Sequence, residues 1–269
     1  MSAATPTTAT RPTASQVAAS VAADLTAASI ASLAISPFIT AIDVSIFTSA
    51  SSGMTMKQAV MHEAKQMVRQ PMKYFKSASF AWVWGLYAAT YAAANLSSTF
   101  LPMLDLDRKT QDNTKFAITA LVNVPACVLK DRHFTRAFSG GTGIIRPIRV
   151  PTYTLYAARD SLTVFSSFVL PPIISQMLQD RTGMEAKYAK FSAQILSPVS
   201  MQVIAAPLQS WGADIYMRPD VSGGDRARMV AARYAGTTAL RMSRKLPAFG
   251  VGGVINTEMR AAAACARLD

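Results

Sequence analysis

Arg159 and Asp160 are adjacent in the sequence and stand directly before Ser161–Gln179, a run without charged residues. A cation beside an anion within an apolar segment could hold the carboxylate and the ammonium of a zwitterion by charge-assisted hydrogen bonds. Alternatively, the two residues begin a helix, with Asp160 near the positive end of the helix dipole and Arg159 at the lipid headgroups. The sequence leaves both interpretations open.

Two further residues are candidates for the same kind of site. Arg244 could provide a second contact for an anion, or it could simply be the last basic residue of its loop. Trp82 belongs to an aromatic group that could line a cavity, although such a group also fits an interfacial belt at the membrane surface.

Catalysis finds no support in the sequence. His62 and His133 lack a carboxylate or cysteine constellation beside them. The glycines of Gly250–Gly253 do not follow a strand of a βαβ unit, so they indicate close helix packing and not dinucleotide binding. Cys127 and Cys265 have no metal-ligand spacing and are expected to be free thiols. We therefore predict no enzyme, no cofactor and no metal site.

The composition favours a membrane protein. Hydrophobic residues make up 51% of the chain and charged residues only 16%, although the net charge is +12. Ordinary soluble domains contain about 25% charged residues. The excess of apolar residues disfavours the alternative of a soluble, basic nucleic-acid binder, so no nucleic acid is expected as a partner.

Six stretches with few or no charges are candidates for helices that cross a bilayer. They are Thr26–Ile42, Ser77–Leu104, Phe116–Leu129, Ser161–Gln179, Phe191–Ala213 and Leu246–Thr257. The residues before the first of them are rich in alanine, serine and threonine, which predicts a disordered tail over residues 1–25.

The connections between these stretches alternate in charge. Residues 57–76, 130–149 and 214–245 each have a net charge of +4, because cations outnumber anions five to one, five to one and seven to three. Residues 105–115 are neutral and residues 180–190 carry +1. The positive-inside rule then places the three basic connections on one side of the membrane and both termini on the other.

The first and third basic connections contain amphipathic segments, Met56–Gln70 and Arg226–Leu240. Such segments are expected to lie along the membrane surface, where their cations could contact anionic lipid. Packing against the underside of the protein is compatible with the same pattern.

One pattern of proline, aspartate and glycine occurs three times. Each aspartate precedes a glycine by ten residues and follows a proline by six, six and seven residues. The three copies are Pro37–Asp43–Gly53, Pro125–Asp131–Gly141 and Pro207–Asp214–Gly224. A cation also stands shortly before a proline at the end of each basic connection, which indicates a threefold internal repeat.

This plan resembles the mitochondrial carrier family of solute transporters, with degenerate signature motifs. The resemblance implies an all-α membrane protein with six transmembrane helices in three tandem two-helix repeats, at residues 26–111, 112–184 and 185–269, and short amphipathic helices on the matrix side. It implies helix kinks at Pro37, Pro125 and Pro207. It also implies a transporter of a small anionic or zwitterionic metabolite in the mitochondrial inner membrane, and an amino-acid-like substrate at Arg159 and Asp160.

The residues that follow the three prolines depart from the family's pattern of acid and base, since only Lys130 stands where the family has a cation. Asp43, Asp131 and Asp214 could form ion pairs with neighbours such as Arg132 and Arg218, or they could cap helix ends or face the lipid headgroups. The missing charges suggest an alternative function: a non-transporting structural subunit or assembly partner of an inner-membrane complex.

Overall fold

The computed structural model describes residues 13–138 and 147–266, and everything below refers to these residues. They form helices and connecting turns, without strands. The predicted all-α class is therefore correct. The first half of the chain contains α1 (Ala14–Ser52), α2 (Met56–Arg69), α3 (Pro71–Phe75), α4 (Ala78–Phe100), η1 (Leu101–Met103) and α5 (Arg108–Ala137). The second half contains α6 (Val150–Phe168), α7 (Leu170–Thr182), α8 (Ala186–Ser200), α9 (Gln202–Met217), α10 (Gly223–Ser243), the π-helix η2 (Leu246–Gly252) and α11 (Gly253–Cys265).

The first helix is longer than expected. The Thr13 hydroxyl accepts a hydrogen bond from the Gln16 backbone while the Gln16 side chain accepts one from the Thr13 backbone, which is a capping box. The alanine-rich residues that follow have a high helix propensity. The predicted disordered tail over residues 1–25 is therefore wrong from Ala14 onward, and residues 1–12 lie outside the described residues.

The repeated punctuation has different structural roles in its three copies. Pro37, Pro125 and Pro207 all lie inside helices, in α1, α5 and α9. Gly53 ends α1 with a φ of 71°, a conformation that glycine adopts without strain, whereas Gly224 belongs to the first turn of α10. Gly141 falls outside the described residues. The three prolines thus all lie inside a helix, whereas the described glycines Gly53 and Gly224 lie at opposite ends of their helices.

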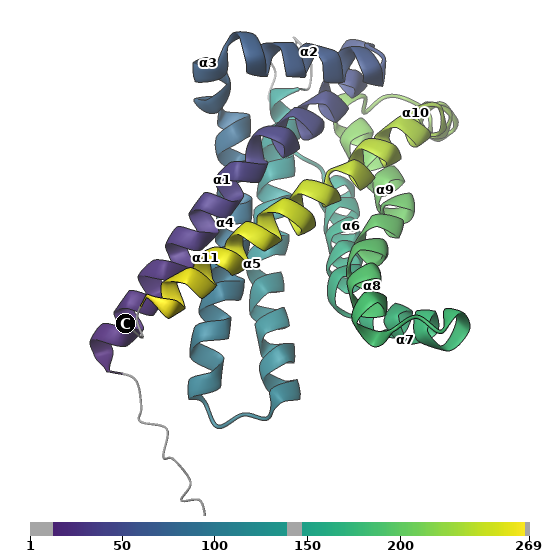
Figure 1. Cartoon of the computed structure of the whole chain (residues 1–269). Helices are drawn as coiled ribbons and strands as arrows, with labels where there is room; N and C mark the ends of the chain where they lie inside the picture. Colours follow the sequence, from purple (N-terminus) through teal and green to yellow (C-terminus); the bar gives the residue numbers. More distant parts are fainter. Residues whose placement is uncertain (1–12, 139–146, 267–269) are drawn as a thin grey trace, which may run out of the picture.

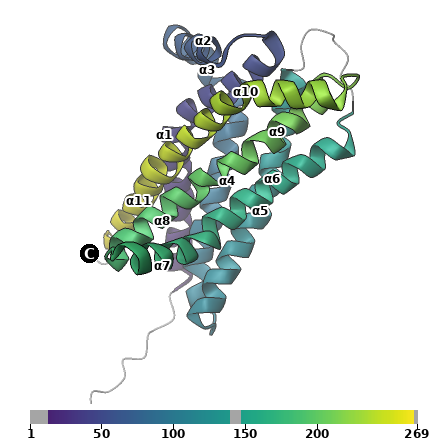
Figure 2. The ribbon, with the colours of Figure 1, turned by 90° about the vertical axis from the view of Figure 1, so that its right-hand side faces the viewer.

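The helices pack around a closed circuit. α1 packs against α4, α4 against α5, α5 against α6 and α6 against α9. α9 in turn packs against α10, while η2 and α11 return to α1. The antiparallel pair α4–α5 and the neighbouring pair α1–α11 can be followed in Figure 1, and Figure 2 shows α6 and α9 side by side, running in opposite directions.

Small residues permit the close contacts of α1. Seven of its fifteen buried positions are alanine or serine, and Ala31, Ser32 and Ser36 are fully buried. Small side chains allow helix backbones to approach each other, which is the usual basis of helix association in membranes. At the centre, a hydrophobic cluster joins α1, α4, α5, α9 and η2 through Ile35, Ile39, Val44, Phe47, Val83, Phe134, Ala213 and Ala248.

The connections lie where the charge alternation predicts. The basic α2 and the start of α10 are at the top of Figure 1, and α10 contacts α2. The neutral α4–α5 turn, α7, the start of α1 and the end of α11 are in the lower part. The first and third basic connections therefore lie at the same end of the bundle.

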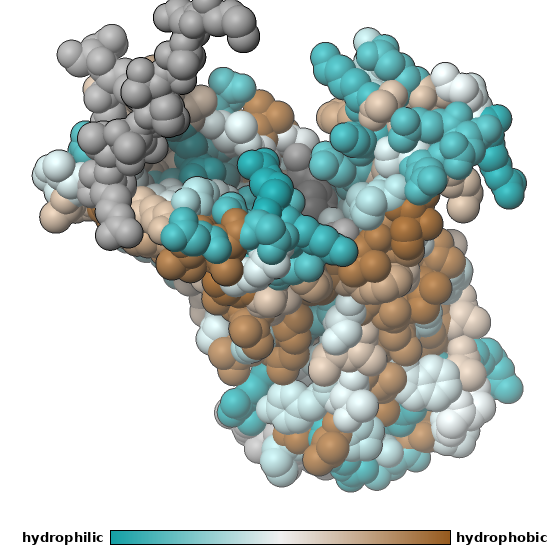
Figure 3. Space-filling view, turned by 90° about the horizontal axis from the view of Figure 1, so that it is seen from below, coloured by the Kyte–Doolittle hydropathy of each residue, from teal (hydrophilic) through white to brown (hydrophobic). Residues whose placement is uncertain are grey.

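By length and composition, two helical stretches among the described residues can cross a membrane, Ala14–Ser52 and Ala186–Met217. A third is added if Val150–Ser167 and Leu170–Thr182, bent by 44°, count as one span. Many large hydrophobic side chains are also exposed, Leu121 at 75% and Phe191 at 64% among them. Figure 3 shows such side chains as a broad brown zone, with hydrophilic side chains gathered at its edges. The outer surface is thus suited to lipid.

The expected six spans are not all recovered on this criterion. The first turns of α5 carry several charged residues, and the last apolar run is divided between η2 and the 13-residue α11.

Candidate functional site

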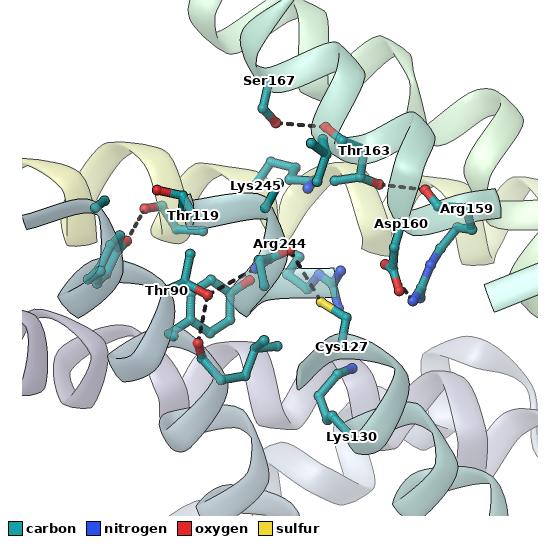
Figure 4. Close-up of a pocket in the computed structure, with 18 of the residues that line it drawn as sticks. Thr90, Thr119, Cys127, Lys130, Arg159, Asp160, Thr163, Ser167, Arg244 and Lys245 are labelled. Atoms are coloured by element: carbon teal, nitrogen blue, oxygen red, sulfur yellow. Dashed lines mark hydrogen bonds and ion pairs between the residues drawn. The ribbon is translucent and has the colours of Figure 1, made fainter. Parts of the chain in front are cut away.

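A cavity of about 240 Å³ lies between α4, α5, α6, the end of α10 and η2. One part of its lining is charged and another consists of hydroxyl, amide and apolar groups. The charged lining residues are Lys130, Arg159, Asp160, Arg241, Arg244 and Lys245. Figure 4 shows how the side chains from α5, α6 and the segment after α10 surround this space.

Arg159 and Asp160 lie well inside α6 and not at its start. They are 2% and 4% exposed, and Arg159 Nη2 lies 2.6 Å from Asp160 Oδ1. The interpretation that Arg159 faces the headgroups is therefore wrong. Its buried position is possible because Nη2 also lies 2.5 Å from Asp131 Oδ2 and Nη1 donates to Gln209 Oε1 at 2.7 Å.

This pair is one end of a chain of ion pairs that crosses the bundle. Lys130 Nζ lies 2.8 Å from Asp131 Oδ1 and 2.7 Å from Asp43 Oδ2 on α1. Arg244, which follows α10, pairs with the other oxygen of Asp43. These contacts join α1, α5, α6 and the end of α10 in one chain of ion pairs. Its members, in order of contact, are Arg244, Asp43, Lys130, Asp131, Arg159 and Asp160. We call it the central network.

The three repeated aspartates take part in ion pairs and do not cap helix ends. Asp43 and Asp131 belong to the central network, and Asp214 accepts hydrogen bonds from Arg218 and Arg226, both at 2.7 Å. The predicted pairing of Asp214 with Arg218 is correct. Arg132 is not the partner found for Asp131; Lys130 and Arg159 take that place.

The other predicted site residues are placed as follows. Arg244 lines the cavity together with Arg159 and Asp160. Trp82 is not part of this lining; it is 38% exposed and stacks on His133, with ring centroids 5.8 Å apart. The structure therefore brings three of the four predicted residues together and leaves Trp82 on the outer surface.

A second polar cluster, which we call the outer cluster, lies beyond the cavity in the direction of the α4–α5 turn. Arg260 Nε on α11 donates to Asp24 Oδ1 on α1 at 2.6 Å, and Thr99 Oγ1 on α4 donates to Asp24 Oδ2 at 2.5 Å. The side-chain amides of Asn95 and Asn256 exchange two hydrogen bonds of 2.8 Å. The cluster joins α1, α4 and α11.

Sequence reasoning missed several of these residues. The sequence places Asp24 within the expected disordered tail, and Arg241 is one of the charges of a basic connection. Their burial, 3% and 1% exposed, could not be inferred from the local sequence. The available signal for Asp24 was that α1 contains only two charged residues, Asp24 and Asp43, within a long alanine-rich run.

These observations define a helical membrane protein with a buried, charged cavity enclosed by its helices. Residues 27–264 match a protein family described as "Probable citrulline exporter". Since the match covers most of the chain, the protein belongs to this family. No curated protein and no solved structure matches the chain.

The family membership corrects the resemblance inferred from the sequence. The chain matches the probable citrulline exporters, and the assignment to the mitochondrial carrier family is wrong. Helix-interior prolines and alternating basic loops are general properties of helical membrane proteins. The acid and base that follow the kink proline in carriers were the specific signal, and this chain lacks them. The mitochondrial inner-membrane location and the inner-membrane complex followed from that resemblance and lose their support with it.

Proposed function

We propose that the protein exports a small zwitterionic amino-acid-like metabolite, citrulline or a close relative, through the cavity beside the central network. The observation that carries the proposal is the buried pair Arg159–Asp160 in the wall of that cavity. The family description points to the same class of substrate and to transport in place of catalysis.

The cavity has a suitable size and chemistry for such a substrate. Its volume of about 240 Å³ is just below the range of ~300–1,000 Å³ that is usual for sites of drug-sized ligands. Opposite charges in a low-dielectric wall hold a carboxylate and an ammonium strongly, since water does not compete for them. A small zwitterion is therefore favoured over a large or purely apolar molecule.

The closed circuit of helices supports six membrane spans as part of the proposal. They are α1, α4, α5, α6–α7, α8–α9 and η2–α11, in three two-helix units at residues 26–111, 112–184 and 185–269. Pro37, Pro125 and Pro207 occupy the first helix of each unit. In this arrangement the basic connections share one membrane side, in agreement with the positive-inside rule.

Two polar clusters at the two ends of the cavity support an alternating-access mechanism. The central network ties α1, α5, α6 and the end of α10 together on the side of the basic connections. The outer cluster ties only α1, α4 and α11. Opening would exchange ion pairs on one side for contacts on the other, which requires two states of similar free energy.

The surface of α2 supports contact with lipid. Lys57, Lys65 and Arg69 are exposed beside the exposed apolar side chains Met61 and Val68. Its one acid, Glu63, is buried, and burial raises the pKa of that carboxyl. The exposed face of α2 is thus basic and apolar, which suits an interface with anionic lipid headgroups.

The alternative of a non-transporting structural subunit rested on missing ion pairs. The central network supplies buried ion pairs between helices, although at other positions than the carrier pattern requires. No other observation favours that alternative, so we do not propose it.

The proposal is tested by transport in vesicles that contain only the purified protein. Vesicles loaded with radiolabelled citrulline are expected to release it faster than protein-free vesicles, and unlabelled citrulline outside should change the rate. Arg159→Gln and Asp160→Asn should each reduce the flux at least tenfold, since each removes one half of the charged pair. Equal release from vesicles with and without the protein would contradict the proposed function.

A further inference from the structure

The charges around the cavity are unequal in number. The central network and the cavity wall together contain five cations and three anions. They are Lys130, Arg159, Arg241, Arg244 and Lys245 against Asp43, Asp131 and Asp160. A buried cation that has no anionic group beside it is unfavourable, so the carboxylate group of a ligand is stabilised where it lies against such a cation.

Arg241 carries this surplus most directly. It is 1% exposed, and its Nε donates to Gln202 Oε1 on α9 at 3.2 Å. Its Nη1 atom has no hydrogen-bond partner among the described residues, and the side chain forms part of the cavity wall. Buried guanidinium donors are normally paired, so this one is available to a ligand.

Asp160 has the complementary property. Oδ1 is paired with Arg159, whereas Oδ2 is buried without a hydrogen-bond partner among the described residues. The same cavity is therefore lined by an unpaired donor that requires an anion and by an unpaired acceptor that requires a donor.

The remaining polar lining is uncharged. It consists of hydroxyl and amide groups, contributed by Thr90, Thr119, Asn123, Thr163 and Ser167. Such groups can form hydrogen bonds with a neutral polar side chain, and they offer no partner for a second charge.

We propose that Arg241 binds the α-carboxylate of the substrate, that Asp160 binds its α-ammonium through Oδ2, and that the uncharged lining receives a neutral polar side chain. Arg159 then positions Asp160 and does not itself hold the carboxylate, because its two terminal nitrogens are engaged by Asp131, Asp160 and Gln209. This assignment rests on the proposed function, since it names the groups that recognise the substrate.

The test compares three ligands on the purified protein: citrulline, the analogue that lacks the α-carboxylate and the analogue that lacks the α-amino group. Binding is measured as the ligand-induced rise in unfolding temperature in detergent, over a range of ligand concentrations. Flux is measured in vesicles. The wild-type protein should bind citrulline at least tenfold more tightly than either analogue.

Each variant should lose one specific preference. Arg241→Gln should weaken citrulline binding at least tenfold and bind citrulline and the decarboxylated analogue about equally. Asp160→Asn should abolish the preference for citrulline over the deaminated analogue and retain the preference over the decarboxylated analogue. Arg228→Gln removes a guanidinium from the same helix, but that side chain is 84% exposed, so its binding should equal that of the wild type.

If Arg241→Gln does not fold, Arg241→Lys provides a second test. This substitution keeps the charge but lacks the guanidinium Nη1 donor, so citrulline affinity should still fall about tenfold. Wild-type affinity in Arg241→Lys, or an unchanged preference over the decarboxylated analogue in Arg241→Gln, would overturn the assignment.

The two measurements separate this inference from the proposed function. Citrulline binding that depends on Arg241, without flux in the wild type, would overturn transport and support the assignment. Flux with the same selectivity among the three ligands in the wild type and in Arg241→Gln would support transport and overturn the assignment.

Discussion

Lys130 on α5 and Asp43 on α1 form an ion pair of 2.7 Å between side chains that are 2% and 4% exposed. The two residues are 87 positions apart in the sequence. Asp43 also pairs with Arg244 and Lys130 also pairs with Asp131, so removal of either residue affects several partners. This contact connects the first helix of the bundle to the residues that line the cavity.

Asp43→Asn is expected to destabilise the protein strongly. The substitution removes the carboxylate that the buried Lys130 shares with the partly buried Arg244, and breaking a buried pair costs about 3–5 kcal/mol. Thermal unfolding in detergent should show a large decrease in the unfolding temperature. The control is Asp225→Asn, which breaks an ion pair whose aspartate is 60% exposed, worth ~0–1 kcal/mol. Equal unfolding temperatures for the two variants would contradict the structural role of Asp43.

Gly252→Ala is expected to disturb the contact of η2 with α1 and α4. A Cβ atom at this position would lie 2.5 Å from Tyr91 Oη and 3.0 Å from Ile35 Cδ1. Tyr91 Oη also donates to the Ala248 carbonyl at 2.6 Å, so it cannot move without loss of that bond. Overpacking of this kind costs about 1–3 kcal/mol.

The matched control is Gly250→Ala, because a Cβ atom there meets nothing within 4 Å. Unfolding temperatures of both variants in the same detergent provide the measurement. A decrease in Gly250→Ala as large as in Gly252→Ala would show that the π-helix itself, and not the contact with Tyr91, is sensitive to substitution.

The sequence was sufficient for the features that depend on local composition. Uncharged runs predicted helices, charge alternation predicted the common end of the first and third basic connections, and the apolar run after Arg159–Asp160 made this pair a candidate for a site inside the bundle. The sequence also suggested that glycines near Gly252 serve close helix packing, which is correct for Gly252 and not for Gly250 or Gly253.

The features that depend on contacts between distant segments could not be predicted. Arg241 is one of seven cations in residues 214–245, and nothing in its neighbourhood distinguishes a buried guanidinium from a solvated one. Asp24 pairs with Thr99 and Arg260, which are 75 and 236 positions away from it in the sequence. Such pairings are determined by the packing of whole helices, and spacing in one sequence does not specify them.

The proposed arrangement of spans predicts the sidedness of the connections. In a variant that lacks both native cysteines, Met61→Cys on α2 and Leu106→Cys before α5 place thiols at positions 51% and 37% exposed. A membrane-impermeant maleimide added to oriented vesicles should label one of the two and not the other. Cys265, restored alone at the exposed end of α11, should be labelled from the same side as position 106. Labelling of positions 61 and 106 from one side would contradict the six-span arrangement.

Cys127 provides a reporter of substrate in the cavity. It lies in the cavity wall beside Asn123, whose Oδ1 is 3.6 Å from its Sγ. In a Cys265→Ser background, a small methanethiosulfonate reagent should modify Cys127, and citrulline should slow this reaction several-fold because it occupies the same space. The rate should be followed by mass spectrometry at increasing citrulline concentration. Protection should disappear when Asp160→Asn is added, since the ammonium then lacks its partner. If citrulline protects Cys127 equally in the presence and absence of Asp160, the binding position beside this carboxylate is wrong.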